Sequence, residues 1–211
     1  MKTVLTFCLF ACLHLVATPK VVVFDFGGVV AKVDRSPIVH FLAESFEVSS
    51  SKIYKDFSSD RLYQSLDEPL SFWEQYSGKK LGLQWHRELE LQKRGVVQKI
   101  PGMEELIQDL KERGVQVALL SNTKAIRARF IEREGGYDLF DPILLSCHLG
   151  CKKPNLKIYE KLLHSLPYAP EECLFIDNAK KNVKAAKQCG LDGIVFQSVE
   201  HLQEKLKKRG L

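Results

Sequence analysis

Val21–Val30, VVVFDFGGVV, is the stretch that decides the fold of this chain. Its first four residues are apolar and three are valine, a run too short for a helix and typical of a strand buried on both faces. Asp25 follows, and Gly27 and Gly28 then allow the backbone to turn sharply and to approach a ligand closely. In a parallel sheet Asp25 would lie at the carboxyl edge, where α/β proteins hold their functional groups. For this stretch alone, a turn-forming aspartate after a buried strand is the alternative.

The composition is that of a folded soluble protein. Of the 211 residues 45% are hydrophobic and 27% are charged, which excludes a disordered chain. The net charge of +5 is spread over helical stretches such as KKNVKAAK and EKLKKRGL, as expected for solvated helix faces. These basic runs contain no interleaved aromatic residues and no zinc-finger spacing, so we expect no nucleic-acid partner. The oligomeric state is left open.

The first residues have the pattern of an export signal. Lys2 precedes an almost unbroken apolar run from Val4 to Ala17, and this run is shorter than the ~20 residues that a transmembrane helix needs. We therefore expect residues 1–17 to be a signal peptide, with a periplasmic or secreted mature protein and no stable membrane anchor. The pattern Val16-Ala17-Thr18 lacks a clean Ala-x-Ala site, which leaves an uncleaved extension on a cytoplasmic protein as the alternative.

Helical spacing replaces the strand pattern after residue 35. Ile38, Phe41, Leu42 and Phe46 recur at i, i+3, i+4 and i+8, and residues 70–94 carry both tryptophans without a strand pattern. We predict that residues 35–96 form a helical cap, inserted between residues 18–34 and 97–211, which form an α/β core. Some cap side chains could either contact a substrate or form the cap's own core: Trp73, Tyr76, Trp85 and His86.

From Ile100 onward helices and strands alternate, which predicts a doubly wound parallel sheet of the Rossmann type with right-handed crossovers. Strands are expected at residues 115–121, 142–147, 173–177 and 193–196. Helices are expected at residues 103–114, 124–134, 154–166, 180–190 and 199–209.

Polar groups follow the later strands at places where they could meet Asp25. Ser121 and Asn122 come before a helix whose N-terminus favours an anion such as phosphate. Asp177 ends the apolar run CLFID, and two acids from separate strands can hold Mg²⁺ together with water and substrate oxygens. Lys153 could orient Asp25 and neutralise a transferring phosphoryl group. Taken singly, these residues could also be helix caps and a surface lysine.

Four segments in this order resemble the motifs of the haloacid dehalogenase-like hydrolase superfamily: FDFGGVV, LLSNT, GCKKPNLKIY and FIDNAKKNVKAAKQCG. The resemblance covers residues 20–196, and the helical insertion resembles the family's cap. It implies a Mg²⁺-dependent phosphatase acting on a small phosphorylated metabolite through an aspartyl-phosphate. The implied roles are Asp25 as nucleophile, Lys153 as the catalytic motif-three lysine, Ser121 and Asn122 as substrate-binding residues, and Asp25, the Gly27 carbonyl and Asp177 as metal ligands.

Two departures from the family pattern bear on function. Family phosphatases usually have a second aspartate two residues after the nucleophile, as general acid and base, and here that residue is Gly27. The fourth motif often has paired acids, and here it is Asp177-Asn178. Similar variants with glycine include sugar-phosphate phosphatases, such as those acting on glucose 1-phosphate. The alternatives are a metal-independent dehalogenase and a non-catalytic module that binds a phosphometabolite or a partner.

Overall fold

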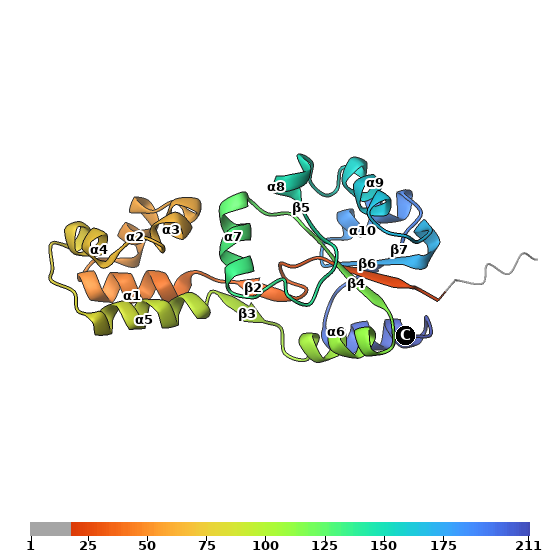
Figure 1. Cartoon of the computed structure of the whole chain (residues 1–211), viewed down its shortest axis with the longest axis horizontal. Helices are drawn as coiled ribbons and strands as arrows, with labels where there is room; N and C mark the ends of the chain where they lie inside the picture. The colour runs from red at the N-terminus through yellow and green to blue at the C-terminus, as the bar shows by residue number, and fades with distance from the viewer. Residues whose placement is uncertain (1–17) are drawn as a thin grey trace, which may run out of the picture.

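The protein has two parts, a helix-covered sheet and a separate group of helices to one side of it (Figure 1). The computed structural model describes residues 18–211, so the expected signal at residues 1–17 lies outside the described residues and stays a prediction. Within residues 18–211, the helices are all too short or too polar to cross a bilayer.

Five parallel strands form the sheet, in the order β5-β4-β1-β6-β7. In that order they are β5 (Ile143–Leu145), β4 (Gln116–Ser121), β1 (Val21–Phe24), β6 (Cys173–Asp177) and β7 (Asp192–Val195). The chain extends the sheet from β1 through β4 and β5 on one side, and through β6 and β7 on the other. The strand order therefore reverses at β1, and such a reversal is where doubly wound sheets bind ligands at their carboxyl ends.

Helices cover both faces of this sheet (Figure 1). They are α6 (Met103–Glu112), α7 (Ala125–Arg133), α8 (Ser146–Leu149), α9 (Leu156–His164), α10 (Lys180–Gln188) and α11 (Val199–Lys207), with a 3₁₀ turn, η1 (Pro170–Glu172). Val22 and Phe24 of β1 belong to the core that includes α6 and α11, whereas Val21 and Val23 belong to the core that includes α9 and α10. Successive residues of a strand point to opposite faces, so a strand between two helix layers must be apolar throughout.

The cap helices lie between two short strands. These helices are α1 (Ser36–Phe46), α2 (Ser50–Asp56), α3 (Ser59–Ser65), α4 (Leu70–Ser77) and α5 (Leu83–Arg94). The strands β2 (Ala31–Val33) and β3 (Val97–Lys99) pair antiparallel and form a stem that joins the cap to the core (Figure 1). The stem was not expected from the sequence, because three residues are too few to show an alternating pattern.

Trp73 is the centre of an aromatic cluster formed by cap residues, within a hydrophobic core that continues into the α/β core. Its side chain is fully buried, and its ring lies 6.1 Å from that of Phe46, 5.9 Å from that of Phe57 and 6.0 Å from that of Trp85. Tyr76 packs on the same cluster. Three of the four cap side chains considered as substrate contacts therefore pack on one another in this aromatic cluster. The fourth, His86, is 40% exposed and lies 4.0 Å from Glu90.

One strand differs from the sequence prediction. Residues 142–147 were expected to be extended, but β5 ends at Leu145 and Ser146 begins α8. The Ser146 hydroxyl accepts a hydrogen bond from the Thr123 amide at 3.0 Å and donates to the Thr123 carbonyl at 3.1 Å. This side chain binds the backbone that follows β4, and the chain leaves the sheet at this point.

Removing the ring of Trp73 is expected to destabilise the cap. Trp73→Ala should lower the free energy of unfolding by about 3–5 kcal/mol, since a buried aromatic side chain is lost and a cavity remains. Urea denaturation followed by tryptophan fluorescence and circular dichroism measures this. Leu83→Ala is the control, because Leu83 is 73% exposed in the same part. Equal decreases in the free energy of unfolding for the two variants would contradict a stabilising role of the aromatic cluster.

Candidate active site

Asp25 is held at the carboxyl edge of the sheet by the backbone on both sides of it. Its amide donates to the Ile176 carbonyl at 2.8 Å, which extends the β1–β6 ladder by one residue. The following turn brings Gly28 against Asn178, where an added Cβ would lie 2.4 Å from the Asn178 Nδ2 atom. Gly28 also has a φ of +79°, so glycine is required here for both space and conformation.

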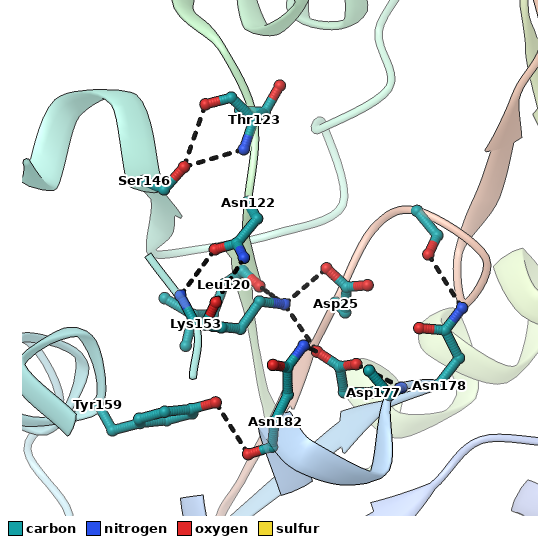
Figure 2. Close-up of polar contacts among 12 residues, drawn as sticks. Asp25, Leu120, Asn122, Thr123, Ser146, Lys153, Tyr159, Asp177, Asn178 and Asn182 are labelled. Atoms are coloured by element: carbon teal, nitrogen blue, oxygen red, sulfur yellow. Dashed lines mark hydrogen bonds and ion pairs between the residues drawn. The ribbon is translucent and has the colours of Figure 1, made fainter. Parts of the chain in front are cut away.

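Lys153 joins the ends of three adjacent strands. Its ammonium donates to Asp25 Oδ1 at 2.7 Å, to Asp177 Oδ2 at 2.8 Å and to the Leu120 carbonyl of β4 at 2.7 Å (Figure 2). A lysine ammonium has three N–H donors, so all of them are used. The residue is 3% exposed, which makes it a buried, fully hydrogen-bonded cation rather than the surface lysine considered as its alternative.

Asn122 holds the backbone of Lys153. Its Nδ2 donates to the Lys153 carbonyl at 2.9 Å, and its Oδ1 accepts from the Lys153 amide at 2.9 Å (Figure 2). Both ends of the Asn122 side-chain amide are thus engaged with the main chain of Lys153, which they position, and substrate binding by Asn122 stays a prediction. Ser121, one residue earlier, is 5% exposed at the last position of β4. The expected residues are therefore gathered at one edge of the sheet.

Asp177 lies in a network that sequence reasoning missed. It is fully buried; its Oδ1 accepts from the Ala179 amide at 2.7 Å and its Oδ2 from Asn182 Nδ2 at 2.9 Å. Tyr159 in turn donates to the Asn182 carbonyl at 2.8 Å (Figure 2). Asn182 is 7% exposed on the buried side of α10. A polar residue on the apolar face of this helix is the signal that could have revealed it.

The buried site carries an excess of negative charge. Two carboxylates, of Asp25 and Asp177, share a single ammonium. Burial raises the pKa of Asp25 above its ordinary value; Lys153 acts against this rise and the Asp177 carboxylate adds to it. A buried charge without a partner is unfavourable, so the site favours a further cation.

The donor set fits Mg²⁺. The oxygen donors of this edge are the carboxylates of Asp25 and Asp177 and the Gly27 carbonyl, which accepts a long hydrogen bond of 3.4 Å from Asn178 Nδ2. These are hard oxygen donors, and Mg²⁺ binds through one or two carboxylates with water and substrate phosphate oxygens completing its shell. Asn178, the next residue after β6, carries no charge. Asp177 is therefore the one carboxylate that the end of β6 offers to a metal ion.

The chain belongs to the haloacid dehalogenase-like hydrolases, whose family model matches residues 19–190. A sesquiterpene phosphatase of Aspergillus oryzae is 29% identical over 183 residues, which cover 84% of this chain and 89% of the relative. A D-ribitol-5-phosphate phosphatase of Bacteroides thetaiotaomicron is 27% identical over 187 residues, covering 82% and 89%.

Solved structures share the fold. A haloacid dehalogenase family enzyme from Bacteroides thetaiotaomicron, in complex with magnesium and inorganic phosphate, has a TM-score of 0.56 and 21% identity, and covers 87% of this chain and 98% of that one. At this identity the likeness concerns the fold. It confirms the predicted parallel α/β sheet with a helical insertion.

Replacing Lys153 should destabilise the metal-free protein. Lys153→Met leaves two buried carboxylates without their cation, and removing one partner of a buried ion pair costs about 3–5 kcal/mol. Added Mg²⁺ should recover part of the loss. Chemical denaturation with and without Mg²⁺ measures both effects, with the exposed neighbour in Lys152→Met as the matched control.

The loss of stability caused by Lys153→Met should also depend on pH. Without Lys153 the pKa of Asp25 rises further, so the native state binds a proton more tightly than the unfolded state does, and stability falls as pH rises through that range. The destabilisation by Lys153→Met should accordingly be smaller in acid than at neutral pH. A loss that grows on acidification, or that equals the loss of Lys152→Met, would contradict the arrangement.

Proposed function

We propose that the protein is a Mg²⁺-dependent phosphatase of a small phosphorylated metabolite, acting through an aspartyl-phosphate on Asp25. The observation that carries the proposal is the buried triad of Asp25, Lys153 and Asp177 at the carboxyl edge of the sheet. The two relatives named above, both phosphatases, support a phosphorylated substrate. A sugar or sugar-alcohol phosphate is one option for its class.

In the first half of the reaction a carboxylate oxygen of Asp25 forms a bond to phosphorus, while the bond from phosphorus to the leaving oxygen breaks and that oxygen keeps the electron pair. Water then attacks phosphorus, which releases inorganic phosphate and restores the carboxylate. Lys153 orients Asp25 through Oδ1 and places a positive charge beside the phosphoryl group. Ser121 and the backbone amides before α7 supply donors for phosphoryl oxygens. Mg²⁺, held by Asp25, the Gly27 carbonyl and Asp177, would neutralise phosphoryl charge.

Asp177 distinguishes the phosphatase function from the dehalogenase and binding-module alternatives. Asp177 is fully buried and accepts hydrogen bonds from Lys153, Asn182 and the Ala179 amide. Two buried carboxylates share the one ammonium of Lys153, so a further cation such as Mg²⁺ would offset their charge, which supports the metal-dependent phosphatase over the metal-independent dehalogenase. A non-catalytic module would bind phosphate without needing a nucleophile oriented by a buried lysine.

Asp25→Asn should abolish hydrolysis of every substrate in a panel of phosphorylated metabolites and leave the fold intact, because an amide has the same shape but is no nucleophile. The unchanged protein should need Mg²⁺ and lose activity in chelator. Phosphate release measured with and without Mg²⁺ tests both statements. Activity retained by Asp25→Asn would remove Asp25 from the mechanism, and full activity in chelator would favour the dehalogenase alternative.

Position 27, where a general acid is absent, has room for a side chain. A Cβ added to Gly27 would have no atom within 4 Å, and Gly27 is absent from the residues with positive φ. An aspartate therefore fits here without backbone strain. In the chain as it is, the leaving oxygen must take its proton from water, from the substrate or from a group outside this position. A positioned acid typically contributes ~10² to 10⁴ in rate, so this absence should be visible in the kinetics.

Aryl, acyl and anomeric sugar phosphates should be hydrolysed much faster than simple alkyl phosphates, since good leaving groups depart without a proton. Gly27→Asp should narrow this gap by accelerating the alkyl esters. The measurement is kcat/KM against leaving-group pKa for both proteins, with Mg²⁺ binding of the variant checked first. Values of kcat/KM that do not depend on the leaving-group pKa in either protein would contradict the hypothesis that the reaction lacks a general acid at position 27.

A further inference from the structure

An open cleft lies where the cap joins the core. Its volume is about 690 Å³, within the range of about 300–1,000 Å³ that small-molecule sites have. Within residues 18–211, its walls include Phe26 but not Asp25, Lys153 or Asp177, so it is separate from the candidate active site. We call it the stem cleft, because β2 and β3, which join the two parts of the molecule (Figure 1), help to line it. It is defined by residues from the segments around it: Phe26, Ala31, Arg94, Val97, Asp138 and Leu139.

The floor of the stem cleft is apolar. Phe26 lies in it, and the loop after α7 comes close to this ring at Gly136, where an added Cβ would be 3.3 Å from Phe26 Cζ. Val97 and Leu139 are half-buried and pack against the same hydrophobic core. Ligand sites of this size typically combine an apolar surface with a small number of polar groups that orient the ligand. The floor would therefore take the apolar part of a ligand.

The rim of the stem cleft carries charges of both signs, and most of them are paired within the protein. Five of the seven charged residues that line it form ion pairs: Lys99 with Glu104 at 2.6 Å, Glu90 with Lys93 at 2.5 Å, and Arg133 with Asp67 and, at 3.6 Å, with Glu134. The other two, Arg94 and Asp138, are exposed and form no ion pair or side-chain hydrogen bond among the described residues. In that part of the chain, the cleft thus offers one unpaired cation and one unpaired anion.

We propose that the stem cleft is a second ligand site, which binds a small zwitterion with an apolar body, such as an apolar amino acid or a short peptide. The ligand carboxylate pairs with Arg94 and the ligand ammonium with Asp138, while the apolar side chains lie on the floor. A ligand with charge of one sign would meet a like charge on the same rim, and an uncharged ligand would pair with neither group. A zwitterion is the class that satisfies both.

A ligand in the stem cleft touches both parts of the molecule at once. Arg94 is the last residue of the cap helix α5, and Asp138 belongs to the core loop between α7 and β5. Ala31 and Val97 belong to the two strands of the stem. Because a ligand stabilises the conformation to which it binds, binding here should hold the cap in one position relative to the core. This requires no phosphatase chemistry, so the proposal can be tested independently of it.

Calorimetric titration with three probes tests the site. Leucine, dileucine and trileucine carry the same two charges at increasing separation, so the probe whose charges best match Arg94 and Asp138 should bind most tightly. The N-acetylated form of that probe lacks the ammonium, and its amide form lacks the carboxylate. Each form should bind about tenfold more weakly, the effect of losing one hydrogen bond between charged groups.

Two variants assign each charge of the probe to its partner. Arg94→Gln should weaken binding about tenfold and should no longer distinguish the probe from its amide form. Asp138→Asn should weaken binding to a similar extent and should no longer distinguish the probe from its N-acetylated form. Arg87→Gln is the matched control, because Arg87 is an exposed arginine of the same helix as Arg94 and lies outside the cleft. It should leave the affinity unchanged.

Hydrogen exchange locates the bound probe. The tightest probe should slow amide exchange in β2 and β3, which line the stem cleft. Protection confined to the edge of the sheet at Asp25 would place the probe in the candidate active site and overturn the proposal. It would also be overturned if no probe binds at about 10 mM, where a millimolar site is nearly filled, or if the Arg94 and Asp138 variants bind as tightly as the unchanged protein.

Discussion

The site depends on one buried ammonium, that of Lys153, which binds Asp25, Asp177 and the Leu120 carbonyl at once. Each acceptor comes from a different strand, and these three strands are adjacent in the sheet. The register of β1 against β6 pairs Phe24 with Ile176, so the two acids that follow lie side by side. A slip of one residue would turn one of them to the opposite face of the sheet, and the lysine would lose an acceptor. Sheet register and site geometry are therefore coupled.

The sequence was most informative where one physical constraint acts alone. A strand buried on both faces must be apolar, so β1 and β6 could be predicted from Val21–Phe24 and the run that ends at Asp177. Parallel strands bring their carboxyl ends to one edge, which predicted that Asp25, Asp177 and Lys153 would meet there. The parts missed depend on several elements at once. Asn182 looks like any polar helix residue until its contact with Asp177 is known.

Other features that the sequence did not reveal have the same origin. The side-chain amide of Asn122 binds the backbone of Lys153, a residue far along the chain. β5 ends early, and the hydroxyl of Ser146 binds Thr123 across the strand ends. Whether the cap aromatics face a ligand or one another could not be decided from spacing alone, because the cluster joins residues from different segments of the cap, such as Phe46, Trp73 and Trp85.

The cap and the core divide the proposed chemistry between them. The core supplies the nucleophile, the buried lysine and the oxygen donors for Mg²⁺, all on strands or on loops bound tightly to strands. The cap contains an aromatic cluster around Trp73, and its helix α3 packs on α7 of the core. Gly27 offers no carboxylic acid two residues after Asp25, so in the proposed reaction the nature of the leaving group should affect the rate.

The most direct test of the central claim is mass spectrometry of the protein quenched in acid during turnover of a good substrate such as acetyl phosphate with Mg²⁺. The account predicts one added phosphoryl group on the peptide that contains Asp25, removed by hydroxylamine, as expected of an acyl phosphate. A phosphoryl group on another residue would contradict it. So would rapid turnover with no covalent phosphorylation under conditions in which the second half of the reaction limits the rate.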